Sequence, residues 1–198
     1  MQEKPEFIVL VGPPAVGKST YMNNHFDLSR YVVISRDDIV HDIGAQAGLN
    51  YDELFVAPKH DKDFNEKYGN IIQSTNGYSK YAYEKLADMN TKIDLTLKNR
   101  LTDAIANNRS IIVDMTNLTS KTRRRGLNAL GSSFKQYHKI AIVFKSGMSD
   151  IDLLFKRAEH RSKKMGGDKT FSREKIEQMA KQFVDVQSDE GFNEVRYV

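Results

Sequence analysis

The stretch Phe7-Ile8-Val9-Leu10-Val11-Gly12-Pro13-Pro14-Ala15-Val16-Gly17-Lys18-Ser19-Thr20 decides the fold of this chain. An apolar run is followed at once by the pattern G-x-x-x-x-G-K-S. The apolar run predicts a buried strand, and Gly12 and Gly17 then let the backbone turn tightly and come close to an anion. The loop amides form an anion-binding nest at the N-terminus of the following helix. The pattern therefore predicts a phosphate-binding loop (P-loop).

Two side chains of this loop have specific expected roles. Lys18 can reach the β- and γ-phosphates of a nucleotide, and the Ser19 hydroxyl suits Mg²⁺. A chance glycine turn is the alternative, but the strand context that supports the motif is present. We expect the cofactors to be ATP, or another nucleoside triphosphate, and Mg²⁺. The predicted nucleotide-binding residues are Gly12, Pro13, Pro14, Ala15, Val16, Gly17, Lys18, Ser19 and Thr20.

The composition is that of an ordinary folded domain. With 198 residues, 28% of them charged and 39% hydrophobic, the chain is expected to form a single domain, 1–198. The absence of cysteine excludes disulfides, thiolate metal sites and cysteine nucleophiles. The first residues lack the order of a signal peptide, and no apolar run reaches membrane-spanning length. We expect a cytoplasmic protein without membrane contact.

The positive charge is unevenly distributed. The net charge is +4, and the densest basic clusters are residues 121–125 and 156–164. Such clusters fit an acidic partner such as DNA or RNA, although a modest basic excess also arises from solvated lysines. The charge pattern is therefore compatible with a nucleic acid as partner.

Short β-type runs alternate with helical stretches along the chain. The predicted strands are 7–11, 31–34, 111–113, 140–144 and a short one at 195–198. Helices are expected at 18–24, from residue 36, at 79–106, after Asp114, at 149–164 and after Ser172. Strands separated by helices favour parallel crossovers. The fold class is therefore α/β: a three-layer sandwich with a central parallel sheet of four to five strands.

A long insertion separates the second and third predicted strands. In its later part, apolar residues recur at three- and four-residue steps from Leu86 to Ile105, which predicts a helix with a core-facing side. Its first part, about 41–83, is rich in aromatic residues. These aromatics could stack nucleobases or form a small core of their own.

Polar residues follow three of the predicted strands, where ligands bind in open α/β sheets. Asp37 is our expected general base for an attacking hydroxyl, and an N-cap is its alternative role. Asp114 ends a hydrophobic strand and is expected to hold Mg²⁺ with Ser19. Thr116 and Asn117 offer donors to an acceptor, or else only shape the turn.

Arginines supply the remaining charge that phosphoryl transfer needs. Arg157 and Arg161 lie four residues apart and share one helical face, so both could reach the transferring group. Arg123 is a plausible acceptor contact, although three consecutive arginines at 123–125 also fit a solvated face.

These motifs together resemble the P-loop kinase domain of the polynucleotide 5′-hydroxyl kinase family. The matches are the P-loop, Arg36-Asp37-Asp38, Asp114-Met115-Thr116-Asn117-Leu118 followed by Arg123-Arg124, and Lys156-Arg157 with Arg161, in matching order over residues 7–165. The resemblance implies a P-loop kinase fold with an arginine-bearing helical lid at about 150–171. It also implies transfer of the ATP γ-phosphate to a hydroxyl. It implies Asp37 as base, Lys18, Arg157 and Arg161 as transition-state cations, and Arg36, Thr116, Asn117 and Arg123 on the acceptor side.

The sequence also departs from this family. An arginine usually stands three positions after the base and grips the acceptor phosphate, but here that position is Val40. No phosphatase motif follows. Similar phage proteins phosphorylate 5-hydroxymethyluracil bases in DNA, and this acceptor remains an alternative. A small-molecule kinase for nucleosides or sugars and a non-catalytic ATP switch are further alternatives.

Overall fold

A computed structural model describes residues 4–48, 51, 80–166, 169 and 171–198. The chain divides into two compact units. The first contains Met1–Ser35, Asn99–Arg161 and Phe171–Val198, and the second contains Arg36–Lys98 and Ser162–Thr170. We describe each unit by itself. The expectation of one domain over 1–198 stays a prediction.

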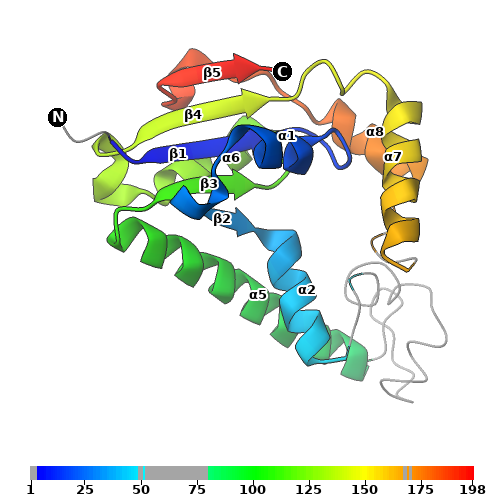
Figure 1. Cartoon of the computed structure of the whole chain (residues 1–198). Helices are drawn as coiled ribbons and strands as arrows, with labels where there is room; N and C mark the ends of the chain where they lie inside the picture. Colours follow the sequence, from blue (N-terminus) through cyan, green and yellow to red (C-terminus); the bar gives the residue numbers. More distant parts are fainter. Residues whose placement is uncertain (1–3, 49–50, 52–79, 167–168, 170) are drawn as a thin grey trace. The chain divides into compact units, whose positions relative to one another are not determined.

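The first unit contains a five-stranded sheet in which every pairing is parallel. Its order is β2-β3-β1-β4-β5, and Figure 1 shows the arrowheads pointing the same way. The strands are β1 (Glu6–Val11), β2 (Tyr31–Ser35), β3 (Ser110–Asp114), β4 (His138–Val143) and β5 (Glu194–Tyr197). The predicted α/β class and parallel sheet are confirmed, and the fold is that of a P-loop kinase.

The central strand β1 is buried because it lies between β3 and β4 and carries apolar residues on both faces. Residues 7–11 are at most 1% exposed. Ile8 lies opposite Ile112 in β3 and Ile140 in β4, so three apolar strands form the middle of the core. Burial on both faces explains why these strands read as continuous apolar runs.

Helices connect the strands of this unit. The chain moves from β1 past β3 to β2, and later from β3 past β1 to β4. Because parallel crossovers are right-handed, these opposite movements put α1 and α6 on opposite faces of the sheet. The helices of this unit include α1 (Lys18–His25), α6 (Ser120–Asn128), the part of α7 (Ile151–Lys164) up to Arg161, and α8 (Arg173–Lys181).

Side-chain caps fix where α6 and α8 begin. Thr119 forms a capping box with Thr122, so α6 begins at Ser120 and its arginines lie one turn inside the helix. Ser172 accepts a hydrogen bond from the Lys175 amide, as its position before an apolar-periodic segment predicts. Each cap joins residues three positions apart, so the signal for the helix start lies within a short stretch of sequence.

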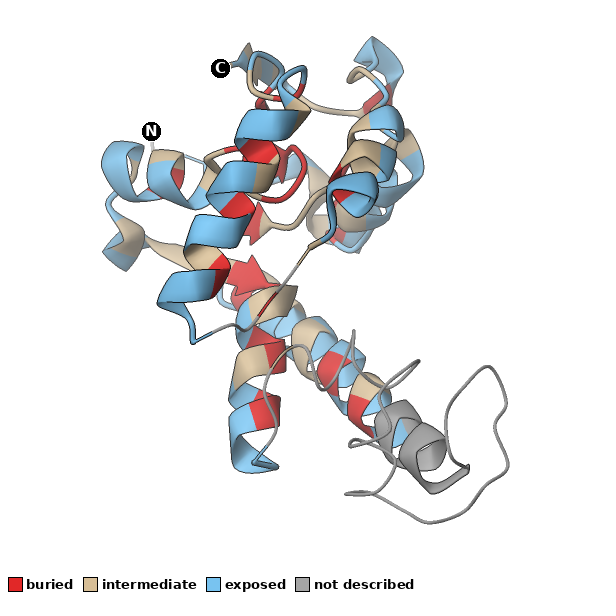
Figure 2. Cartoon of the chain, turned by 90° about the vertical axis from the view of Figure 1, so that its right-hand side faces the viewer, coloured by how far each residue is buried: buried red, intermediate tan, exposed pale blue. Residues whose placement is uncertain are grey.

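The second unit contains α2 (Arg36–Gln46) and most of α5 (Lys80–Ala106). Ile39, Val40 and Ile43 are buried on α2, and Met89 and Ile93 are buried on α5. In Figure 2 both helices carry buried segments next to exposed ones, as expected of helices with one apolar side. The predicted α5 helix is confirmed. The predictions for the aromatic insertion lie outside the described residues, apart from Tyr51.

Candidate active site

The loop between β1 and α1 has the backbone of an anion-binding nest. Ala15 and Gly17 both have left-handed backbone conformations, with φ of 63° and 109°. Alternation of such residues with ordinary ones turns successive N–H groups toward a common centre. Helix α1 begins directly afterwards, at Lys18, so its N-terminal amides face the same region. The geometry supports phosphate binding at this loop.

Tight packing holds the loop in this shape. A Cβ atom on Gly12 would lie 2.8 Å from Cγ1 of Val16, and one on Gly147 would lie 2.7 Å from Cγ2 of the same valine. The Gly12 amide also donates to the Thr116 carbonyl at 2.9 Å. The side chain of Val16 therefore leaves no room for a Cβ atom at Gly12 or at Gly147. The hydrogen bond from Gly12 also connects the loop to the turn that follows β3.

Lys18 folds back over the loop that precedes it. Its Nζ donates to the carbonyls of Gly12 at 2.9 Å and Pro13 at 3.0 Å. The ammonium therefore lies at the loop, where a bound phosphate would meet it. This position agrees with the predicted role of Lys18 at the β- and γ-phosphates, which stays a prediction.

Ser19 and Asp114 meet as a magnesium site would require. The Ser19 hydroxyl lies 3.4 Å from Oδ2 of Asp114. Two oxygens on adjacent corners of an octahedron around Mg²⁺ lie about 2.9 Å apart, so a small movement would let both bind the ion. Mg²⁺ usually takes only one or two protein ligands beside phosphate and water, and this pair fits that chemistry.

Asn117 corrects a prediction. Its side chain is buried, and Nδ2 donates to the Leu10 carbonyl at 2.9 Å. Its backbone is left-handed, with φ of 47°. Asn117 thus joins the turn after β3 to the end of β1, and a further bond of Nδ2 to the Met115 carbonyl lies within the turn itself. These contacts support its alternative role of shaping the turn. The neighbouring Thr116 contributes its carbonyl to Gly12, and its acceptor role stays a prediction.

Arg123 corrects a second prediction, because it lies in the core instead of facing an acceptor. It is 0% exposed and makes a two-pronged ion pair with Glu190, at 2.7 Å from Nε and 2.6 Å from Nη2. The remaining N–H groups donate to the carbonyls of Asn117, Leu118, Val184 and Asp185. All the donors are used, so Arg123 joins α6 to the C-terminal segment.

We expect Arg123→Ala to lower the free energy of unfolding by about 3–5 kcal/mol, because it leaves Glu190 buried without its cation. The neighbouring Arg124→Ala is the control. Arg124 pairs with Asp189 at 2.9 Å on the surface, where such a pair contributes about 0–1 kcal/mol. Urea unfolding measures both variants. Equal losses for the two would contradict the assignment of Arg123 to the core.

The Arg123–Glu190 pair also predicts a dependence of stability on pH. Burial alone would raise the pKa of Glu190, but hydrogen bonds from Arg123 and the Gln187 amide hold that pKa below 4.5. The folded state therefore binds this proton less tightly than the unfolded state. The resulting stability is present above pH 4.5 and is lost as the pH falls below it. We expect Glu190→Gln to be less stable than the wild type at neutral pH, with a smaller further loss of unfolding free energy in acid.

The two lid arginines differ in their surroundings. Arg157 is exposed on α7, whereas Arg161 is half-buried, with its guanidinium 5.8 Å from the centre of the Phe171 ring. Within the part of the chain that the structure describes, Nε and Nη2 of Arg161 are buried and lack hydrogen-bond partners. A buried, unsatisfied guanidinium is costly, and an anionic ligand would satisfy it.

The second unit surrounds Asp37 with two residues that the sequence did not indicate. The Tyr51 hydroxyl donates to Oδ1 of Asp37 at 3.0 Å, and Lys169 forms an ion pair with Oδ2. No local pattern could have found them, because Lys169 lies 132 positions away. Arg36, expected on the acceptor side, pairs with Asp94 at 3.1 Å.

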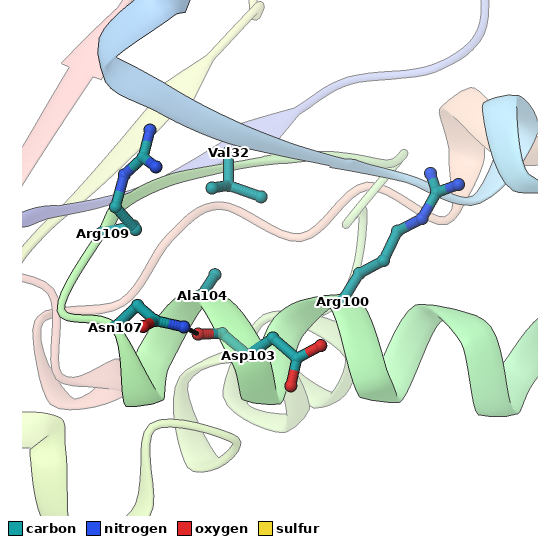
Figure 3. A pocket seen from close by; sticks show the side chains of 6 residues that line it. All are labelled: Val32, Arg100, Asp103, Ala104, Asn107 and Arg109. Carbon is teal, nitrogen blue, oxygen red and sulfur yellow. Dashed lines mark hydrogen bonds between the residues drawn. The ribbon is translucent and has the colours of Figure 1, made fainter.

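A groove elsewhere in the first unit is not part of this site. It has a volume of about 510 Å³ and lies between β2 and α5 (Figure 3). Val32 is near the amino end of β2, and Arg109 directly precedes β3. The P-loop follows the carboxyl end of β1, whereas the groove lies near the amino ends of the parallel strands. It is lined by Val32, Arg100, Asp103, Ala104, Asn107 and Arg109.

Among the described helices, none is long and apolar enough to cross a membrane. No described group of three or more His, Cys, Asp or Glu residues could hold a metal ion. The predicted magnesium site therefore depends on Ser19 and Asp114, together with phosphate and water oxygens.

Comparison with known proteins supports the fold. The sequence profile of the AAA domain family (AAA_33) matches residues 7–185, whereas a comparison with curated proteins finds no match. A chain of the Pnkp1/Rnl/Hen1 RNA repair complex is similar, with 18% identity and a TM-score of 0.52, over 92% of this chain and 45% of that chain. A protein from Chloroflexus aurantiacus j-10-fl, described provisionally as a kinase, has 14% identity and a TM-score of 0.57, over 100% of this chain and 86% of that one. The chain thus spans less than half of the first of these proteins.

Proposed function

This chain belongs to the AAA domain family, and on that premise we propose that it transfers the γ-phosphate of ATP to a hydroxyl group of a nucleic acid. The favoured acceptor is the 5′-hydroxyl end of DNA or RNA. The reaction class follows from the P-loop kinase fold. We infer the acceptor from the surface charge and from the family resemblance.

One observation supports phosphoryl transfer above all others: the nest between β1 and α1 combines Lys18 with the Ser19–Asp114 pair. The lysine supplies a cation at the phosphates, and the two oxygens supply a place for Mg²⁺. When bound, Mg²⁺ neutralises charge on the β- and γ-phosphate oxygens. The first unit therefore contains the groups that bind and polarise a nucleoside triphosphate.

In the proposed reaction, Asp37 accepts the proton of the acceptor hydroxyl. The hydroxyl oxygen forms a bond to the γ-phosphorus, and the bond to the β–γ bridging oxygen breaks, which leaves ADP. Lys18, Arg157 and Arg161 stabilise the charge on the transferring group. Nε and Nη2 of Arg161, which are buried and lack hydrogen-bond partners among the described residues, support a role in anion binding.

Exposed basic residues support a polyanionic acceptor. Lys121, Arg124 and Arg125 are exposed on α6, directly after the turn at the end of β3. On α7, Lys156 and Arg157 are exposed as well. Such side chains bind backbone phosphates without reading sequence. One structural neighbour belongs to an RNA repair complex, which is compatible with this acceptor class.

The burial of Val40 favours a second candidate acceptor. Val40 is 1% exposed on the inner side of α2, so this position supplies no phosphate grip for a terminal nucleotide. A hydroxymethyl group on a base, as in 5-hydroxymethyluracil DNA, has no need of that grip. We keep this base kinase as the second proposal, and a small-molecule kinase as the third.

The test offers γ-labelled ATP with a 5′-hydroxyl oligonucleotide, the same sequence with a 5′-phosphate, DNA containing internal 5-hydroxymethyluracil, and free nucleosides. We expect label on the 5′-hydroxyl oligonucleotide alone, and its loss on trimming from the 5′ end. Label that remains in internal nucleotides would favour the base kinase. Label on nucleosides alone would favour a small-molecule kinase, and tight ATP binding without transfer would favour a switch.

A further inference from the structure

The carboxylate of Asp37 is held by two residues from different parts of the second unit. Tyr51 donates to one oxygen, and the Lys169 ammonium pairs with the other. Lys169 Nζ also lies 5.2 Å from the centre of the Tyr51 ring. Each member of this set therefore contacts both others, which fixes the orientation of the carboxylate more firmly than one contact would.

Lys169 occupies a position that is unusual for a lysine. The residue is only 8% exposed, and its backbone is left-handed, with φ of 58°. Burial of a lysine is rare without a partner, and the left-handed backbone costs about 1–2 kcal/mol for a residue with a Cβ. The pairing with Asp37 offsets these costs, which indicates that the contact is a built feature of the unit.

The contacts leave Asp37 able to react. About 47% of its side-chain surface is exposed, compared with 11% for Lys169. A hydroxyl can therefore still donate to the carboxylate. The arrangement orients the base without covering it.

We infer that Lys169 is a positioning residue for Asp37: it orients this carboxylate and keeps it ionised, with Tyr51 supporting the same geometry. The inference rests on the proposed function, in which Asp37 is the base. An adjacent cation favours the charged form of a carboxylate, and only that form accepts a proton. The cation thus acts through Asp37, not on the transferring phosphate.

Other groups on the packed elements titrate or carry charge, and the experiment must separate them. His41 is the important one, because its ring lies 5.4 Å from that of Tyr51. The other described groups on α2 and the facing part of α5 are Arg36, Asp38, Asp42, Asp88, Lys92 and Asp94. A His41→Gln variant measured in parallel identifies its own contribution.

The test measures kcat/KM against pH for the full chain, with the labelled 5′-hydroxyl oligonucleotide as acceptor. The acidic limb is the part of this profile in which kcat/KM falls as the pH falls. For Lys169→Met we expect the acidic limb to move to higher pH by about one unit, because the cation beside the carboxylate is lost. Transfer should therefore fall about tenfold in acid and recover at higher pH, with KM for ATP unchanged. Lys169→Arg should restore the wild-type limb, and Tyr51→Phe should move it less. Lys92→Met, an exposed lysine on α5, is the matched control.

The outcomes separate this inference from the proposed function. A wild-type acidic limb in Lys169→Met would overturn the inference, and so would a failure of arginine to restore it. If Lys169→Met does not fold, Tyr51→Phe decides in the same way. A different result would show that the proposed function is wrong. In that case Asp37→Asn would transfer phosphate normally, and this result does not depend on the behaviour of the Lys169 variants.

Discussion

Asp37→Asn is expected to lower phosphoryl transfer by about 10²–10⁴-fold, because the amide cannot accept the proton of the attacking hydroxyl. ATP binding should be largely unchanged, since the residues that grip the nucleotide belong to the P-loop. Single-turnover transfer measures the first effect, and a nucleotide titration measures the second. A loss of transfer without a loss of ATP binding would identify Asp37 as a base. A residue that binds ATP would show both losses.

Asp38→Asn is the matched control. Asp38 follows Asp37 on α2 and is exposed. The substitution removes the same charge from the same turn of the helix, so a general electrostatic effect would appear in both variants. Normal transfer by Asp37→Asn, or equal losses in the two variants, would mean that Asp37 is not the base.

Lys18→Ala is expected to impair both ATP binding and transfer. A hydrogen bond to a charged group contributes about 1.5–3 kcal/mol, so the dissociation constant for ATP should rise about 10–100-fold. Transfer should fall by about 10²–10³-fold, because in the proposed reaction the cation stabilises charge that develops on the phosphoryl group. Isothermal titration with a non-hydrolysable ATP analogue and single-turnover transfer measure the two quantities.

Asn24→Ala is the control for Lys18→Ala, because Asn24 is exposed on the same helix, α1. It should retain both binding and transfer. Thermal unfolding of the two variants checks that the helix still forms. Unchanged ATP affinity in Lys18→Ala would contradict the assignment of this loop to the phosphates.

The sequence predicts the architecture of the first unit because its signals are local. A buried parallel strand reads as a continuous apolar run, and a helix start reads as a cap followed by periodic residues. This is why β1, α1 and the Ser172 cap of α8 lie where they were expected. The Ser19–Asp114 approach was also predictable, because parallel strands bring their carboxyl ends to one edge.

Side-chain partners between distant segments could not be predicted in this way. Arg123 looks like a surface arginine in the run 123–125, and only its pairing with Glu190, 67 positions later, shows that it belongs to the core. Asn117 looks like a donor for an acceptor, but it closes the turn onto Leu10. In both cases the sequence identified a side chain that forms polar contacts. It could not show which groups that side chain contacts.

By itself, the sequence determined that this protein has an α/β fold with a P-loop, and it singled out Lys18, Ser19 and Asp114. These features depend on the order of residues within one strand, turn or helix start. Only the tertiary structure decided that Arg123 is buried and that Lys169 holds Asp37, because these contacts join segments far apart along the chain. The physical reason is that sequence periodicity indicates which face of a helix or strand is apolar. Which side chains from distant segments contact that face depends on how the elements pack.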